Sequence, residues 1–211
     1  YKYLGGIYYI VEQNSTAKKL LRKLLGYTGR NEIEDFGFNF NENFFVWLVN
    51  EVYNSRGDIE NTSSSEKKKL ELEEIKGIRG NTEDFQTKVA TSGESVMNVI
   101  STLAFLLESS RLNQIILNLQ YSGHENICLK LQKSTVEILN PYVGAFSDEL
   151  RDNMYSKLYL LVYLEILPLI EQEYRINVAD EQWNHEAYKK FLTDLKNTIV
   201  KKIEEKIGTL T

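Results

Sequence analysis

Hydrophobic and polar positions change their period several times along the chain, and each change predicts a secondary-structure element. Residues 3–11 are aromatic and β-branched, which favours a strand, with a turn or bulge at Gly5 and Gly6. A helix is expected from residues 14–16, whose side chains can cap it, to Gly26. Its apolar positions recur at helical spacing and its other face is basic: Leu20, Leu21, Leu24 and Leu25 against Lys18, Lys19, Arg22 and Lys23.

The next elements are a short strand, a helix and a loop. Three phenylalanines alternate with small or polar residues over residues 36–40, and this period of two predicts a strand. Residues 41–53 then carry apolar side chains at helical spacing, so a helix follows. Residues 54–69 have no apolar period and are rich in Ser, Asn and charge, which predicts a mobile surface loop.

The second half of the fold begins with a strand at residues 70–78, which Gly77 and Gly80 are expected to break. Residues 94–108 form a predicted helix with almost no polar face, so other elements have to cover it on most sides. Alternation and turn residues then predict a run of three strands that supplies this cover: 115–119, 126–131 and 135–139.

The C-terminal third is helical. Pro141 is expected to close the sheet, and residues 147–149 open a long helix that Pro168 kinks or ends early. Asp180 can cap the last helix, whose stripe either packs on the preceding helix or forms a partner-binding face or dimer seam. That apolar stripe is made of Tyr188, Phe191, Leu195, Ile199, Ile203 and Ile207.

Together these elements predict an α+β fold: a small mixed or antiparallel sheet around a buried central helix, with a C-terminal helical pair. We expect residues 1–146 to form an α+β domain with a mobile loop at about residues 54–69. Residues 147–211 are expected to form a helical segment packed on that domain.

The charge of the chain limits which partners are expected. The net charge is −5 at pH 7 and the estimated pI is 5.3, so the chain as a whole does not attract a nucleic-acid backbone. A local basic patch with an aromatic neighbour is nevertheless sufficient for phosphate contacts. The candidate nucleic-acid-binding residues are Lys18, Lys19, Arg22, Lys23 and Arg30.

Cysteine usage and hydropathy predict the compartment. Cys128 is the only cysteine, so no intramolecular disulfide can form and a cytoplasmic location is expected. The longest apolar run, residues 158–170, is interrupted by Glu165 and is shorter than the ~20 residues that a membrane span needs. We therefore expect no membrane partner.

Asp58, Glu74 and Lys76 form a loose D…E-x-K pattern that resembles the signature of metal-dependent nucleases. In that chemistry two carboxylates hold Mg²⁺ and a lysine orients the attacking water. Glu74 and Lys76 share one face of a predicted strand, whereas Asp58 falls in the predicted mobile loop. These residues and Mg²⁺ are the catalytic alternative; apart from them, no catalytic residue, metal site or cofactor is expected.

Two further side chains are unusual in their context. His124 falls in a predicted hairpin turn, where an exposed histidine is expected. Glu165 interrupts the most apolar stretch of the chain, so we expect it to face outward or to pair with an Arg or a Tyr.

These observations favour a non-enzymatic binding or assembly module that contacts nucleic acid or a protein partner. The alternatives are a metal-dependent phosphodiesterase or nuclease and a structural module that forms homo-oligomers. Abundant Asn, Lys, Ile and Glu suggest low-GC coding and so a bacterial or viral multi-component system. A role in antiviral defence is a hypothesis that depends on this compositional hint alone.

Overall fold

Period-two alternation produces three long strands at the centre of the structure. β6 (Arg111–Tyr121), β7 (His124–Gln132) and β8 (Thr135–Val143) follow one another through two-residue turns. Ser122 and Gly123 in the first turn have φ of 28° and 83°, and positive φ at both central residues is what a type I′ hairpin requires. Alternate side chains in the second half of β6 are buried, so one face of these strands is apolar.

The computed structural model describes residues 2–3, 6–9, 14–28, 32–34, 37–61, 68–81, 88–92, 97, 100–108 and 111–209. Within these residues the main sheet has six strands, each antiparallel to its neighbours. β4 (Lys68–Asn81) pairs with β6 along one edge. Its other edge pairs with β3 (Asp58–Asn61) at the start and with β5 (Lys88–Ser92) at the end.

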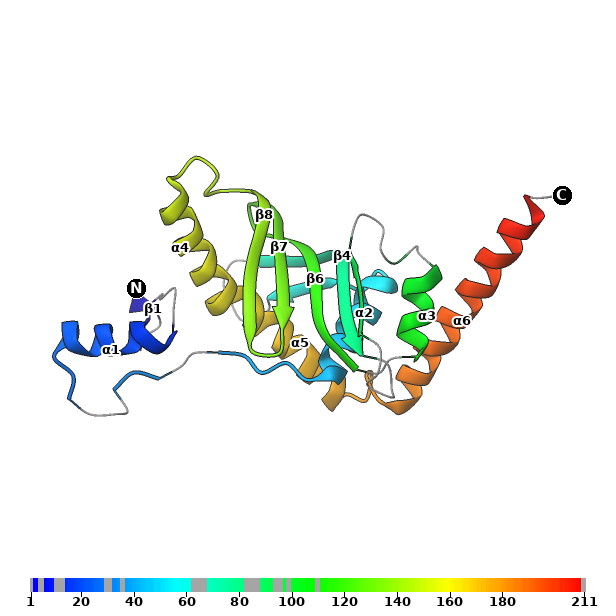
Figure 1. Cartoon of the computed structure of the whole chain (residues 1–211), viewed down its shortest axis with the longest axis horizontal. Coiled ribbons are helices and arrows are strands. Elements are labelled where there is room, and N and C mark those ends of the chain that lie inside the picture. The colour runs from blue at the N-terminus through cyan, green and yellow to red at the C-terminus, as the bar shows by residue number, and fades with distance from the viewer. Residues whose placement is uncertain are drawn as a thin grey trace.

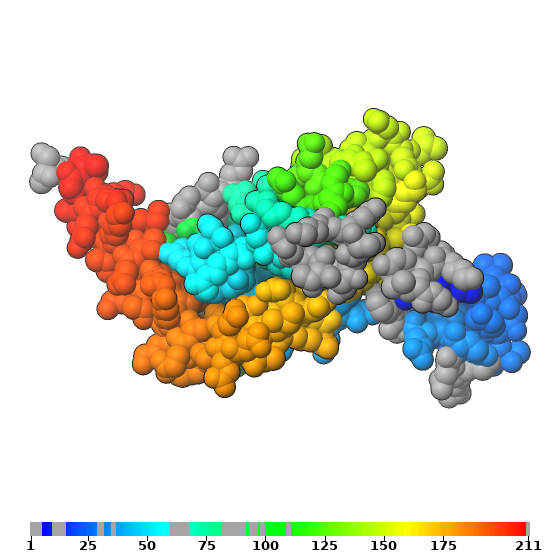
Figure 2. Space-filling view, turned by 180° about the vertical axis from the view of Figure 1, so that it is seen from behind, coloured from blue at the N-terminus to red at the C-terminus, as the bar shows by residue number. Residues whose placement is uncertain are grey.

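Helices cover one face of this sheet (Figure 1). α2 (Glu42–Tyr53) packs against β4 and β6, and its residues 44–51 are all buried. Asn41 caps α2 by accepting a hydrogen bond from Phe44 N at 2.8 Å. α3 (Ile100–Glu108) packs against α6 (His185–Gly208) at one end of the molecule. Figure 2 shows the far side, where α5 and the start of α6 form a continuous orange surface.

A single long helical run crosses behind the sheet. It consists of α4 (Arg151–Leu161), a π-helical turn, η2 (Val162–Ile166), and α5 (Leu167–Ala179). Pro168 cannot donate a backbone hydrogen bond, and in a regular helix its ring would collide with the carbonyl four residues earlier. The widened turn accommodates this, because Leu167 N–H donates to Val162 O, five residues back. The helix therefore continues through Pro168 and does not end early.

The N-terminal unit, which we define as the described residues between 2 and 28, stands apart from the sheet at one end of the molecule (Figure 1). β1 (Lys2–Tyr3) and β2 (Gly6–Ile7) form a small antiparallel pair. α1 (Asn14–Leu25) follows them. The C-terminal end of α6 projects from the opposite end of the molecule.

The structure confirms the α+β class, the antiparallel form of the sheet and the C-terminal helical pair. The predicted helix at 14–26, the helix at 41–53 and the three strands between 115 and 139 are all present. One hydrophobic cluster includes residues of α2, of the sheet and of the C-terminal helices.

Two predictions in the first half of the chain are wrong. The predicted strand at residues 36–40 is absent from its described part, residues 37–40, where Phe38 and Phe40 pack their rings on the core without entering a sheet. Phe38 and Phe40 stack at 5.7 Å, and Phe40 N–H donates to Lys133 O at 2.7 Å. The predicted loop at 54–69 contains β3, which forms because Ile59 is buried against the core. Residues 62–67 of the predicted loop are not among the described residues.

Three further predictions are corrected. The described residues of the expected strand at 3–11 do not form one strand, because Tyr3 of β1 pairs antiparallel with Gly6 of β2. α2 takes the buried position on the sheet, whereas α3, the described part of the helix expected at 94–108, packs on α6. Asn184, and not Asp180, caps α6: its side chain accepts a hydrogen bond from Ala187 N at 2.9 Å.

Gly80 does not break β4. It lies within the strand, at a point where the backbone of Arg111 and the ring of Phe105 come close. A Cβ at this position would lie 2.7 Å from Arg111 O and 2.9 Å from the ring of Phe105. We expect Gly80→Ala to lower the free energy of unfolding by about 1–3 kcal/mol through overpacking, measured by urea denaturation. Gly37→Ala is the matched control, since its Cβ would meet nothing within 4 Å. Equal losses in the two variants would contradict this account.

Candidate nucleic-acid interface

α1 separates its cations from its leucines around the helix. At about 100° per residue the basic side chains take one side and the leucines take the other. Lys19 and Lys23 lie one turn apart and are exposed. Leu20 and Leu24 lie beside them, with 57% and 82% of their surfaces exposed. The accessible strip of α1 therefore combines two cations with two leucines.

The other predicted nucleic-acid-binding residues are less accessible or lie outside the description. Lys18 and Arg22 are half-buried, and both make interactions within the chain. Arg30 lies outside the described residues. The structure thus places four of the five predicted residues on one helix, and Lys19 and Lys23 are the two best placed to meet a partner.

A Schellman motif ends α1 and fixes the residue that follows it. Gly26 adopts the left-handed conformation, with φ of 69°. Tyr27 N–H then donates to Arg22 O at 2.9 Å, the six-to-one hydrogen bond of this motif. Tyr27 is 39% exposed. The motif therefore holds a partly exposed aromatic side chain directly after the basic helix.

Exposed apolar and aromatic side chains are concentrated in the N-terminal unit. Of the 13 large hydrophobic residues that are exposed in the described part of the chain, nearly half lie in this unit. They are Ile7, Tyr9, Leu20, Leu24, Leu25 and Tyr27. A water-exposed set of this kind, next to cations, is typical of a contact surface and not of a helix packed on its own core.

The last turns of α6 show a smaller apolar surface. Phe191 and Leu195 of the predicted stripe are buried, but Ile203 and Ile207 are 43% and 61% exposed. Val200 beside them is 44% exposed. The first four residues of the stripe pack within the chain, and its last two are exposed.

The three residues of the nuclease-like pattern lie on neighbouring strands. Asp58 is on β3, opposite Glu71 in the register, and its Oδ1 lies 3.1 Å from Lys69 Nζ. Glu74 Oε2 and Lys76 Nζ are brought together on β4, 3.7 Å apart. Glu74 is three residues beyond the position that Asp58 faces, which is about 10 Å along a strand. Lys69 thus pairs with the carboxylate that the pattern assigns to a metal.

Glu165 has the kind of partner that its sequence context requires. It lies on η2, and its Oε2 accepts hydrogen bonds from Lys68 Nζ at 2.7 Å and from Tyr121 Oη at 2.8 Å. The prediction that Glu165 pairs with a side chain such as Tyr is confirmed. The partners themselves were missed, because no local pattern connects the ends of β4 and β6 with a helix formed later in the chain.

The prediction of an exposed His124 is wrong. Only 6% of its surface is exposed, because the segment after β8 folds over the turn and places the Phe146 ring 4.8 Å from the imidazole. A hydrogen bond of 2.7 Å joins His124 Nδ1 to Tyr142 Oη, which also accepts from Phe146 N at 3.1 Å. Burial lowers the pKa of His124, and the nearby carboxylate of Glu165 partly opposes this shift.

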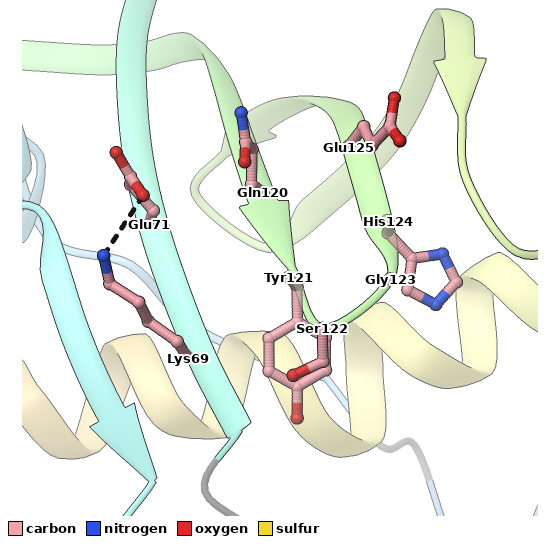
Figure 3. Close-up of a pocket in the computed structure, with 8 residues that line it drawn as sticks. All are labelled: Lys69, Glu71, Gln120, Tyr121, Ser122, Gly123, His124 and Glu125. Atoms are coloured by element: carbon pink, nitrogen blue, oxygen red, sulfur yellow. Dashed lines mark hydrogen bonds and ion pairs between the residues drawn. The ribbon is translucent and has the colours of Figure 1, made fainter.

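A hollow of about 190 Å³ lies at the turn between β6 and β7 (Figure 3). Lys69 and Glu71 line it from β4, and their side chains form an ion pair at 3.3 Å. The ring of His124 lies on the other side of the turn from these two residues. His124 and the charged pair of β4 both line the hollow, but the turn between β6 and β7 separates the imidazole from the two charges.

Among the described residues, no group of three or more His, Cys, Asp or Glu side chains is arranged to hold a metal ion. The described helices include none with both the length and the apolar character that crossing a bilayer requires. Comparisons with protein-family models, with curated proteins and with solved structures found no match to this chain. Its function has to be inferred from its own surfaces.

The buried His124 predicts a specific pH dependence of stability. Its pKa is lowered on folding, so the stability that the neutral ring contributes is complete above its unfolded pKa of about 6.5. This contribution is lost as the pH falls below that value, because the unfolded chain then binds a proton that the folded chain excludes.

We therefore expect the wild type to lose more unfolding free energy than His124→Gln between pH 7.5 and pH 5, measured by urea denaturation at each pH. His185→Gln is the control, because His185 is exposed at the start of α6. Comparing the two proteins cancels the contributions of other titrating groups to the pH dependence. One such group is Glu51, because burial raises its pKa. Parallel pH profiles for the wild type and His124→Gln would show that this imidazole does not exclude the proton.

Proposed function

We propose that this chain is a non-enzymatic binding module of a multi-component system and that it contacts nucleic acid through α1. The observation that carries the proposal is the separation of charge in the molecule. α1 holds four of the 25 basic residues and none of the 30 acidic ones, which leaves 21 basic against 30 acidic residues elsewhere. A polyanion is therefore attracted to one helix of a chain that otherwise repels it.

The position of α1 supports this assignment. The N-terminal unit stands away from the sheet and its helices (Figure 1). At physiological ionic strength, charges more than about 8 Å apart in water are largely screened from each other. Acidic residues of the body that lie beyond this distance cancel little of the local field at Lys19 and Lys23, and the exposed strip is available for phosphate contacts.

Reversing two charges of α1 tests the proposal. In a gel-shift experiment with single- and double-stranded DNA and RNA, we expect Lys19→Glu/Lys23→Glu to lose retention at moderate salt. The slope of log K against log salt should fall by about 2, since about one unit is lost for each phosphate contact removed. Lys189→Glu/Lys190→Glu on α6 makes the same change in net charge at exposed positions and should keep most of the affinity.

Each outcome of this experiment has a distinct meaning. Equal losses in both variants would show that only net charge matters and would remove α1 as the contact. No retention of any nucleic acid by the wild type would overturn the proposed function. Degradation that requires Mg²⁺ and disappears in Glu74→Ala would establish the nuclease alternative.

The exposed apolar residues in the last turns of α6 favour a second candidate function, an oligomerisation module in which a second copy covers Val200, Ile203 and Ile207. If this is correct, the wild type should show a mass above that of one chain by light scattering at high concentration. Ile203→Glu/Ile207→Glu should return it to the mass of one chain, while Ile176→Glu, an exposed position on α5, should not. A wild type that stays monomeric at every concentration would eliminate this candidate.

A further inference from the structure

Phosphate contacts alone leave part of the N-terminal unit unexplained. A helix that only meets the backbone of a duplex uses its cations, and its apolar residues can then be buried on its own protein. Here Leu20 and Leu24 remain exposed beside Lys19 and Lys23, and the exposed Tyr9 and Tyr27 lie in the same unit. The partner therefore has to offer apolar surface as well as negative charge.

Unpaired nucleobases provide that combination. A single strand carries a phosphate at every step, and each base has an apolar face that stacks on aromatic or apolar side chains whatever the sequence. In a duplex these faces are stacked on one another and are inaccessible to a tyrosine at the surface. Charge and exposed rings together thus distinguish a single strand from a duplex.

The Schellman motif prepares one ring for this role. The hydrogen bond from Tyr27 N–H to Arg22 O, together with the left-handed Gly26, fixes the backbone of Tyr27 at the end of the basic helix. A ring on a fixed backbone loses less conformational entropy on binding than a ring on a flexible tail. Tyr27 follows Lys23 by four positions in the chain.

We propose that the N-terminal unit binds single-stranded nucleic acid, with Lys19 and Lys23 pairing with phosphates and Tyr27 stacking on an unpaired base. This inference rests on the proposed function, because it names the kind of nucleic acid that α1 contacts. Tyr9, Leu20 and Leu24 extend the apolar surface on which neighbouring bases lie.

Fluorescence anisotropy with one labelled mixed-sequence oligonucleotide, free or annealed to its complement, tests the inference. The single strand should bind the wild type more tightly than the duplex. Tyr27→Ala should weaken single-strand binding by about 5- to 150-fold, the range expected for one stacked base, and leave duplex binding nearly unchanged. Tyr27→Phe should retain the affinity because it keeps the ring.

Two controls separate the effect of the aromatic ring on affinity from effects on the end of α1 and from general effects of changing the surface. Tyr27→Leu keeps an apolar side chain after Gly26 but removes the aromatic ring, so it should lose affinity without loss of helix content by circular dichroism. Ile176→Ala changes a residue of similar exposure, 41%, outside the unit and should have no effect.

The results distinguish a failure of the inference from a failure of the proposed function. Equal affinity for the single strand and the duplex, or full affinity of Tyr27→Ala for the single strand, would overturn the inference and leave α1 as a phosphate contact. Absence of binding to either form would overturn both.

Discussion

The fold depends on covering one apolar sheet face. β4, β6 and β7 direct rows of Leu and Ile toward the same side, and this side has to be removed from water. α2 meets the need by lying directly on β4 and β6 with eight consecutive residues buried. Such a helix has no solvated face of its own, so α5 and α6 are required to cover it in turn. Hydrogen bonds from polar side chains of α2 hold the covering segments in place. Trp47 Nε1 donates to Asn177 Oδ1 at 3.4 Å, and Asn43 Oδ1 accepts from Trp183 Nε1 at 3.0 Å.

Much of this fold follows from periodicity alone. The three strands after residue 111 and the helices at 14–25 and 42–53 could be predicted because each has one uninterrupted period. The errors occur where tertiary contacts decide. Gly80 looks like a break in isolation but allows the close approach of Arg111 and Phe105, and Phe40 alternates like a strand residue but packs against Phe44 at 4.7 Å.

The candidate site was predictable to a similar degree and for the same reason. The cations of α1 are a local pattern, so the sequence identified them. The exposure of Leu20 and Leu24 is not local, because a leucine stripe on a helix ordinarily packs on a core and only the position of α1 shows that it does not. Tyr121 and Lys68 could not be predicted as the partners of Glu165, because they precede it by 44 and 97 positions in the chain.

Some unusual side chains of this chain are held within the fold, and others are left exposed at its surface. Glu165 and His124, the two side chains that are unusual in their sequence context, are each held by hydrogen bonds that join elements of the fold. The exposed apolar side chains discussed above lie in the N-terminal unit and in the last turns of α6, at opposite ends of the molecule. A contact built from about two phosphate pairs and a stacked base is weak by itself, and the acidic body repels any longer stretch of the polyanion. Such a contact becomes effective when other subunits hold the same strand, because a tethered second site raises the effective concentration. If the chain binds nucleic acid as proposed, the weakness of such an interface argues that it acts within an assembly.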